Sequence, residues 1–178
     1  SSGSAVDFGD VSYYNYTGST NSSSIRGFFS GGQTPAGSPY YTNVISAITT
    51  STTGSHEDWG DLLKARSNLP AGFGNSTRGF CAGGADQPYT GDMNTIQFFS
   101  VITSGNATDF GDLNTNYEYI CGTCDATRGL IAQGQTGGSA YNTIEFVTMS
   151  TTGNAKDFGD LTVARQGGQA VSNGHGGL

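Results

Sequence analysis

The amino-acid sequence predicts an all-β fold built from four-stranded antiparallel units that recur about every 50 residues. Three observations support this prediction: a composition rich in glycine and aromatic residues, landmarks that repeat in one order, and short apolar segments separated by turn residues. The chain has 178 residues, of which 29 are Gly, 10 are Phe and 9 are Tyr. Aromatic side chains supply the large buried surfaces that disordered segments lack, and abundant glycine suits short strands joined by tight turns.

The charge and hydropathy of the chain exclude several classes of partner. The formal net charge is -7, and the seven basic residues are scattered singly. A phosphate-binding surface needs clustered Lys and Arg, so we expect no nucleic-acid partner. No apolar run approaches the roughly 18 residues of a membrane span, so we expect no membrane insertion. Because the chain begins at Ser1 without a signal segment, we expect that processing or fragmentation removed what came first.

The first landmark of the repeat is the motif Asp-Phe-Gly-Asp, with Trp in place of Phe in one copy. Successive copies are spaced by 51, 51 and 48 residues, and a glycine-containing turn precedes each copy. A sequence that repeats at such a period builds the same structural unit each time. We therefore expect structural roles for Asp7, Phe8, Asp10, Asp58, Trp59, Asp61, Asp109, Phe110, Asp112, Asp157, Phe158 and Asp160.

Two further landmarks recur in the same order and at nearly the same period. The dipeptide Arg-Gly stands before an apolar strand at Arg26, Arg78 and Arg128. Asn followed two residues later by Ile occurs at Asn43, Asn94 and Asn142. Three ordered landmarks at one spacing establish an internal repeat.

One period contains four expected strands. In the period 62–112, the strands are expected at 69–74, 78–82, 95–101 and 109–113. Their apolar and polar residues alternate imperfectly, which is typical of strands covered on both faces by neighbouring sheets. Four short antiparallel strands in a period of roughly 40 to 50 residues are the signature of a β-propeller blade.

The whole chain is then expected to form a single repeat domain of about 3.5 blades. Whole blades are expected at 11–61, 62–112 and 113–160, with 1–10 as the outer strand and 161–178 as the inner strand or strands of a split blade. A propeller usually needs at least four blades. Three closures are open: a four-bladed ring closed by the two termini, a ring shared with a second chain, or a longer polypeptide.

The order of these motifs resembles the kelch blade, in which a glycine pair ends the second strand and an aromatic residue lies on the outer strand. The segment 151–165, Thr-Thr-Gly-Asn-Ala-x-Asp-Phe-Gly-Asp-Leu-Thr-x-Ala-Arg, and the closing segment 172–178 resemble kelch-like repeats in structural proteins of marine tailed bacteriophages. The resemblance implies a location in a virion or outside the cell. One departure is the glycine pair, intact at Gly31-Gly32 and Gly83-Gly84 but replaced by Gln133-Gly134-Gln135.

The repeated charges and aromatic residues suggest structural roles. We expect the arginines of Arg-Gly to pair with an Asp of the repeat or with strand-end carbonyl groups, which would hold neighbouring blades in register. The repeated aspartates could instead bind calcium, but two Asp separated by two residues provide too few oxygen ligands, so no metal is expected. The aromatic residue of each Asp-x-Gly-Asp motif is expected in the core between blades.

Tyrosines in the variable loops are the candidate binding residues. The loops at 34–42, 85–93 and 135–141 leave the same edge of their blades and should cluster on one face. Tyr with Gly, Ser and Asn suits contact with sugars or with a protein neighbour, although these rings could also merely cover the loops. The candidates are Tyr13, Tyr14, Tyr16, Tyr40, Tyr41, Tyr89 and Tyr141.

No catalytic chemistry is expected from this chain. Its two histidines, His56 and His175, occupy non-equivalent places, and no nucleophile elbow or phosphate loop is present. Some kelch propellers are copper enzymes, but two His cannot readily supply that site. The pair Cys121-Gly-Thr-Cys124 has the spacing of a redox motif or half a zinc site, yet lacks partner ligands. We expect a loop there, with a local disulfide or two free thiols, and no cofactor.

These observations together favour a non-enzymatic structural or adhesive module of a phage virion or another extracellular assembly. The expected partners are other copies of the chain or neighbouring subunits, with a cell-surface glycan as a further candidate. The alternative is a carbohydrate-binding, lectin-like propeller.

Overall fold

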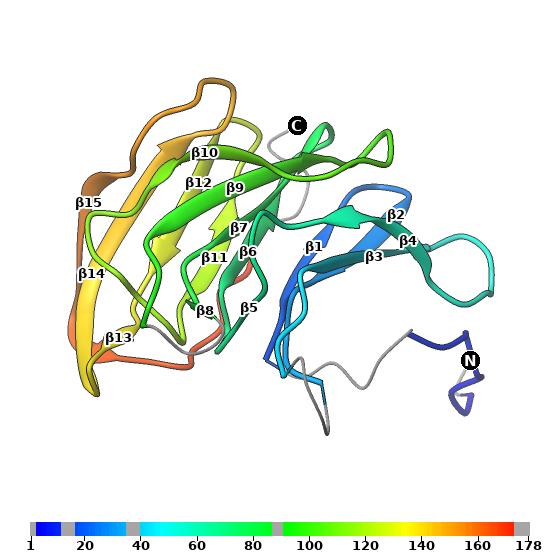
Figure 1. Ribbon diagram of the computed structural model, residues 1–178, viewed down its shortest axis with the longest axis horizontal. Coiled ribbons are helices and arrows are strands. Elements are labelled where there is room, and N and C mark those ends of the chain that lie inside the picture. The colour runs from blue at the N-terminus through cyan, green and yellow to red at the C-terminus, as the bar shows by residue number, and fades with distance from the viewer. Residues whose placement is uncertain (1–2, 12–16, 35–39, 87–90, 173–178) are drawn as a thin grey trace.

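The computed structural model describes residues 3–11, 17–34, 40–86 and 91–172. Within these residues the chain is all-β, with fifteen strands and no helix (Figure 1). Thirteen of the strands form three antiparallel sheets that follow one another along the chain, and the other two form a separate two-stranded sheet. The predicted all-β, antiparallel class is therefore confirmed.

Each large sheet is built from consecutive strands. Sheet 1 consists of β1 (Ser19–Ser22), β2 (Arg26–Ser30), β3 (Val44–Thr49) and β4 (Glu57–Asp61). Sheet 2 consists of β6 (Ala71–Gly74), β7 (Arg78–Ala82), β9 (Thr95–Ser100) and β10 (Thr108–Asp112). Sheet 3 contains β11 (Cys121–Cys124), β12 (Arg128–Ala132), β14 (Ser139–Thr148) and β15 (Lys156–Arg165). The four strands expected in the period 62–112 match the strands of sheet 2.

Three short strands supplement these sheets. β5 (Arg66–Ser67) pairs with β8 (Ala85–Asp86), and β13 (Gln135–Thr136) pairs with the start of β14. The expected loop at 135–141 is thus wrong, because this segment forms a β-hairpin. Gly137 and Gly138 form its turn with φ values of 55° and 82°. Both residues of a type I′ hairpin turn need positive φ, which glycine adopts freely.

The Asp-x-Gly-Asp motif forms a β-bulge in each sheet. In sheet 1, Asp58 faces Ser46 and Gly60 faces Ile45, so Trp59 is the extra residue between them. Sheets 2 and 3 repeat this register shift around Phe110 and Phe158. A bulge bends its strand and re-aims a side chain. In sheets 1 and 2 the motif therefore directs its aromatic residue toward the following sheet.

The same pair of backbone hydrogen bonds joins each of the first three motifs to the sheet that follows it. Gly54 N donates to Phe8 O (2.8 Å) and His56 N donates to Asp10 O (3.0 Å). In the same way, Gly105 N donates to Trp59 O and Ala107 N donates to Asp61 O, which joins sheet 2 to β4. Gly153 N donates to Phe110 O and Ala155 N donates to Asp112 O, which joins sheet 3 to β10. We call this contact the sheet joint.

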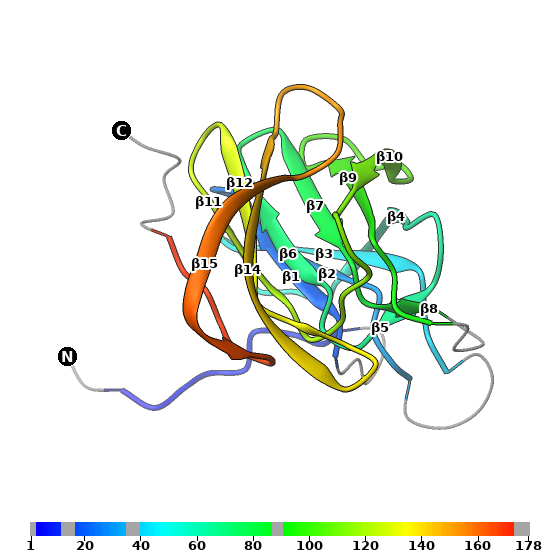
Figure 2. The same cartoon turned by 90° about the vertical axis from the view of Figure 1, so that its left-hand side faces the viewer.

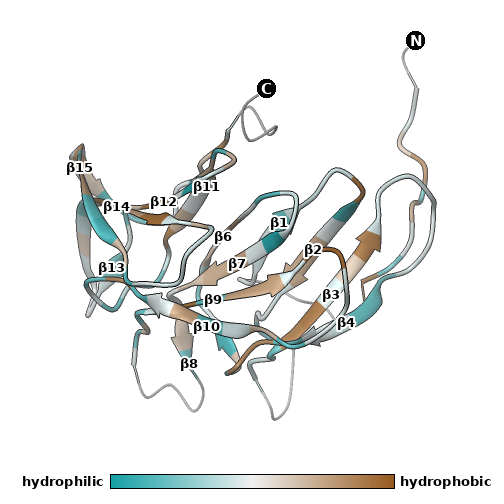
Figure 3. Cartoon of the chain, turned by 90° about the horizontal axis from the view of Figure 1, so that it is seen from above, coloured by the Kyte–Doolittle hydropathy of each residue, from teal (hydrophilic) through white to brown (hydrophobic). Residues whose placement is uncertain are grey.

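The core consists of two layers, each between adjacent sheets. Between sheets 1 and 2 the buried residues are Phe28, Ile45, Ala47, Trp59, Leu62, Cys81, Phe99, Val101 and Ala107. Between sheets 2 and 3 they include Phe80, Ile96, Phe110, Leu113, Ile131, Val147, Met149 and Ala155, most of them one period later. Figure 3 shows the sheets side by side, with β1, β6 and β11 toward the middle and β4, β10 and β15 farther out.

The expectation that all four motif aromatics lie in the core is wrong for two of them. Trp59 is 5% exposed and Phe110 is 2% exposed, but Phe8 is 39% and Phe158 is 51% exposed. Phe158 belongs to β15, and no further sheet of the described residues covers this strand (Figure 2). The three sheets do not close into a ring within the part of the chain that the structure describes.

The replaced glycine pair keeps its backbone conformation. Gly31 and Gly83 have φ values of 65° and 64°, and Gln133 has a φ of 55° at the same repeat position. Its side chain is buried and its Nε2 donates to Cys121 Sγ (3.0 Å). Sheet 3 therefore tolerates a left-handed non-glycine residue because the surrounding contacts hold it in place.

Candidate binding face

A buried carboxylate ties together the loop side of the molecule. Glu118 stands just before β11, and its Oε2 accepts a hydrogen bond from Asn68 Nδ2 (2.6 Å) while its Oε1 accepts one from Gln135 Nε2 (2.6 Å). The backbones of Glu118 and Gln135 also exchange hydrogen bonds at 3.0 and 2.9 Å. A buried charge is tolerated only when hydrogen bonds replace its hydration. This cluster, which we call the Glu118 cluster, joins the strand entrances of sheets 2 and 3.

Two tyrosines border the Glu118 cluster. Tyr41 hydrogen-bonds the Asn68 side chain, and burial, followed by the Glu118 charge, raises the pKa of its hydroxyl. Burial and then Glu118 likewise raise the pKa of Tyr119, with a further contribution from Asp92. A phenol beside negative charges is disfavoured in its ionised form. Both tyrosines are therefore neutral hydrogen-bonding groups at physiological pH.

The loops of neighbouring units also contact one another on this side. Gly137 N donates to Asp92 Oδ2 (3.4 Å), which links the β13–β14 turn to the segment before β9. Tyr141 packs against Tyr117 with their ring centroids 5.4 Å apart. The Gly137–Asp92 bond thus places the β13–β14 turn of the third unit beside the segment before β9 of the second unit.

The structure places three of the seven candidate tyrosines. Tyr40 is exposed, Tyr41 borders the Glu118 cluster and Tyr141 is half-buried against Tyr117. Tyr13, Tyr14, Tyr16 and Tyr89 lie outside the described residues. Tyr40 is thus the described candidate best placed for a partner, whereas Tyr141 contributes to packing.

Sequence reasoning did not find Asn68, Glu118 or Gln135. The sequence did single out Glu118, which is one of few acidic residues outside the Asp-x-Gly-Asp motifs. Asn68 occupies the repeat position that Glu118 occupies in the next unit, three residues before the inner strand. The residues lie 50 and 17 positions from Glu118. No local pattern indicates that they meet.

A hollow of about 670 Å³ lies at the opposite end of the inner strands. Its lining comes from the inner strands β1, β6 and β11, from the turns that follow them and from residues 170–172. The lining includes Asn21, Phe73, Asn75 and Thr123 but no charged side chain. Phe73 belongs to the core and is only 4% exposed, so the neutral amide and hydroxyl groups are what the hollow offers, and these suit an uncharged polar ligand.

The repeated aspartates cap their own turns. Oδ1 of Asp7, Asp58 and Asp157 accepts a hydrogen bond from the backbone N–H two residues later, at 3.0 to 3.1 Å. This local bond is a common use of Asp in tight turns. The described residues contain no group of three His, Cys, Asp or Glu placed to hold a metal ion.

The three Arg-Gly arginines stack on aromatic rings. The guanidinium carbon of Arg26 lies 4.6 Å from the Trp59 ring centre, and that of Arg78 lies 4.6 Å from the Phe98 ring centre. Arg78 Nη1 also donates to the Met149 carbonyl of sheet 3 (2.7 Å). The sequence predicted that these arginines pair either with an Asp of the repeat or with a strand-end carbonyl group, and Arg78 makes the second kind of contact. Arg26 lies instead 3.7 Å from Glu57, outside the motif, and Arg128 is exposed beside Phe146.

The expectation of a loop at Cys121-Gly-Thr-Cys124 is wrong, because the four residues form β11. Both thiols are free, as is that of the buried Cys81. Residues three apart on a strand point to opposite faces, which keeps the two sulfur atoms apart. Burial raises the pKa of both Cys121 and Cys124. This geometry opposes a redox or zinc role for the pair.

Comparison with known proteins gives no family for the chain: no family model and no curated protein matches it. In the described ranges no helix is long or apolar enough to cross a membrane. The interpretation of function therefore depends on the repeat, the sheet joint and the two ends of the inner strands.

Proposed function

We propose that this protein is a non-enzymatic structural or adhesive module with a β-propeller arrangement of blades, and that it belongs to a phage virion or another extracellular assembly. The observation that carries the proposal is the sheet joint, which recurs with the same two hydrogen bonds three times in the described residues. Such repetition builds a rigid scaffold whose loops vary while its sheets stay constant.

The arrangement of the sheets supports the propeller part of the proposal. Each unit is a four-stranded antiparallel sheet, and β6 packs between β1 and β11. Inner strands that meet while outer strands diverge are typical of blades around an axis. The kelch-like order of Arg-Gly, Asn-x-Ile and Asp-x-Gly-Asp motifs is consistent with the same arrangement.

The loop side is the surface that we assign to contact with a protein neighbour or a receptor. It contains the exposed Tyr40 and the half-buried Tyr41 and Tyr119 around a rigid Glu118 cluster. Tyrosine gives a large contact area with little loss of side-chain entropy. Asp86 and Asp92 make this side acidic, so the matching partner surface is neutral or basic.

A lectin-like propeller is the second candidate function. It is favoured by the uncharged hollow with Asn21, Asn75 and Thr123 in its lining. Sugars present many hydroxyl groups, so neutral amide and hydroxyl side chains suit contact with them.

Two measurements on the purified 178-residue chain test the proposed function. Electron microscopy or crystallography is expected to show blades side by side around one axis, and a glycan array is expected to show no specific binding. Substantial helix or a two-layer sandwich would overturn the propeller module. Glycan binding that Thr123→Val abolishes and Tyr40→Ala retains would establish the lectin instead.

A further inference from the structure

The outer side of sheet 3 presents half of a sheet joint without a partner sheet in the described residues. Phe158 is 51% exposed, although its equivalents Trp59 and Phe110 are buried. An added Cβ at Gly111 would lie 2.5 Å from Gly153 O, whereas one at Gly159 would have no atom within 4 Å. The acceptor motif of the joint is therefore formed at 157–160 and uncovered.

The apolar residues around this motif are uncovered to a similar degree. Leu130 and Ile144 are half-buried, although the equivalent residues Phe80 and Ile96 are fully buried between sheets 2 and 3. Figure 2 looks onto this side and shows β14 and β15 in front, with no other strand over them. Sheet 3 thus offers the same face that sheets 1 and 2 use for docking.

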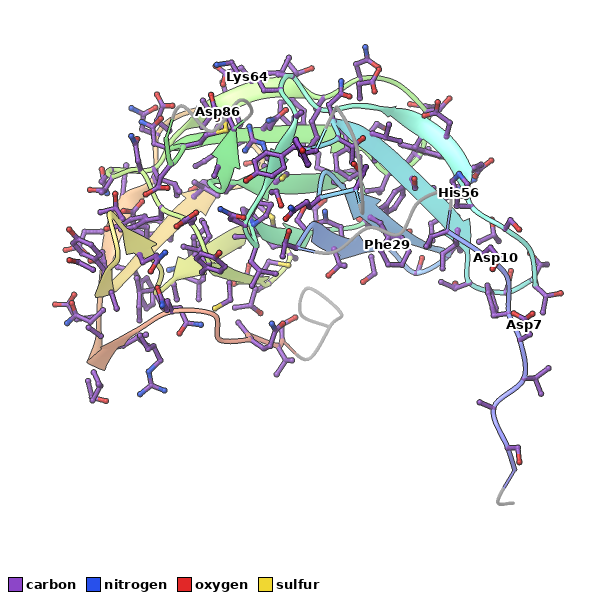
Figure 4. All side chains as sticks on the ribbon, turned by 60° about the horizontal axis from the view of Figure 1, so that its bottom comes forward. Asp7, Asp10, Phe29, His56, Lys64 and Asp86 are labelled. Atoms are coloured by element: carbon purple, nitrogen blue, oxygen red, sulfur yellow. The ribbon has the colours of Figure 1, made fainter. Side chains whose placement is uncertain are left out.

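Sheet 1 presents the complementary half of the joint. Three of its side chains are only half-buried: Phe29, Ile48 and His56. In sheet 2 the residue equivalent to Phe29 is Cys81 and the residue equivalent to Ile48 is Phe99, and both are buried. Figure 4 shows His56 near Asp10 of the N-terminal segment, with Phe29 farther along sheet 1. The donor turn with Gly54 N and His56 N is therefore set beside an incompletely covered apolar face.

Residues 7–10 occupy this donor turn in the single chain. Their sequence, Asp-Phe-Gly-Asp, is identical to that of residues 157–160. They accept the hydrogen bonds of Gly54 and His56, yet residues 3–11 form no strand and Phe8 and Val6 remain exposed. The N-terminal segment fills the hydrogen-bonding half of the joint without covering the apolar half.

We propose that sheet 3 of one copy docks on sheet 1 of a second copy, and that residues 157–160 displace residues 7–10 from the Gly54–His56 turn. The proposal names the partner of the proposed scaffold and rests on that function. The exchange replaces two backbone hydrogen bonds with two of the same kind. The additional burial of apolar surface on both sheets drives association. Because each chain carries a net charge of -7, added salt should strengthen it.

Sedimentation velocity of the 178-residue chain over a range of concentrations tests the proposal. The chain is expected to associate, and Phe158→Asp should weaken association at least about tenfold because it places a charge in the docked face. The control is Ile102→Asp, since Ile102 is 60% exposed in the β9–β10 turn and belongs to neither face. Circular dichroism checks that both variants keep their β structure.

A second variant tests the displacement itself. A Cβ at Gly9 would lie 2.5 Å from the Gly54 carbonyl carbon, so Gly9→Val should release residues 7–10 and tighten association several-fold. Gly3→Val is the matched control, because a Cβ at Gly3 has no atom within 4 Å. Association that appears only in Gly9→Val also supports the displacement.

Three results would overturn the proposal: both the parent chain and Gly9→Val stay monomeric, Phe158→Asp associates as well as Ile102→Asp, or Gly9→Val weakens association. The last would mean that the N-terminal segment is itself the contact. None of these results alters the outcome of the imaging and glycan-array tests of the proposed function, so the two failures are distinguishable.

Discussion

The backbone N–H of Gly105 donates to the carbonyl of Trp59 at 2.7 Å, and this bond brings the turn before β10 against the bulge of β4. The approach leaves no room for a side chain at Gly60, where a Cβ would lie 2.6 Å from the Gly105 carbonyl carbon. Packing between sheets thus requires the glycine of the first three Asp-x-Gly-Asp motifs, whereas at Gly159 only its positive φ of 141° favours glycine.

Substitution of Gly60 should weaken the joint between sheets 1 and 2. We expect Gly60→Ala to lower the free energy of unfolding, because the backbone strain at this φ costs about 1–3 kcal/mol. The steric overlap with Gly105 should increase this loss. Denaturant unfolding followed by tryptophan fluorescence measures the change at the joint. Gly54→Ala is the control, since a Cβ there has no atom within 4 Å. Equal losses in the two variants would contradict the packing argument.

Phe110 and Phe158 hold the same repeat position with very different burial. Phe110→Ala should cost about 3–5 kcal/mol of stability, because it opens a cavity between sheets 2 and 3. Phe158→Ala should cost less than about 1 kcal/mol in the dilute monomer, since its ring is half exposed. Thermal or chemical unfolding of both variants at low concentration checks this difference. A large loss from Phe158→Ala in the monomer would show that Phe158 is packed.

Glu145 should make stability fall as the pH rises. Its carboxyl is buried, and burial raises its pKa above the ordinary value of 4.5, so the folded state binds this proton more tightly than the unfolded state does. The free energy of unfolding therefore decreases as pH increases above 4.5 and levels off above the folded pKa.

Sheet 2 carries Gln97 at the position of Glu145, and its Oε1 accepts from Leu63 N (2.7 Å) as Glu145 Oε2 accepts from Asn114 N (3.1 Å). Glu145→Gln should therefore stabilise the protein at pH 8 by on the order of 1 kcal/mol and flatten the pH profile. Unfolding curves at pH 4 and pH 8 provide the test. A stability gain of equal size at both pH values would point to a cause other than ionisation.

Glu118 should control the ionisation of the loop-side tyrosines. Because its charge raises the pKa of Tyr41 and Tyr119 beyond the effect of burial, Glu118→Gln should lower both toward the ordinary value of 10. Difference titration of tyrosinate absorbance between the parent and the variant measures the shift. The control is Glu57→Gln, an exposed carboxylate near Arg26. Indistinguishable titrations of the parent and Glu118→Gln would place the carboxylate outside this cluster.

The cysteines should react slowly as thiols in the native protein. Cys81 is buried, and burial raises the pKa of Cys121 and Cys124, so little thiolate is present at neutral pH. A chromogenic thiol reagent should react with all three cysteines in denaturant and far more slowly without it. Fewer than three reactive thiols in denaturant under non-reducing conditions would reveal a disulfide and contradict the geometry of β11.

The all-β class, the four strands of one period and the spacing at which they recur were determined by the sequence itself. Strand β7, for example, follows from a pattern a few residues long, because alternation and turn glycines act locally. The bulge at each Asp-x-Gly-Asp motif and the short strands β5, β8 and β13 appeared only in the structure. Because the motifs recur at nearly one spacing, the strands expected in one period could be expected in the other periods as well. The prediction of a loop at 135–141 was wrong, because the two consecutive glycines Gly137 and Gly138 form a hairpin turn there.

The tertiary structure decided which repeated residues are covered and which distant residues meet. Phe110 and Phe158 have the same local sequence, but only a neighbouring sheet can bury a ring, and sheet 3 covers Phe110 alone. Glu118, Asn68 and Gln135 meet because the packing of the sheets brings their strand entrances together. Hydrogen bonds and burial between segments tens of residues apart depend on three-dimensional position, which no short stretch of sequence encodes.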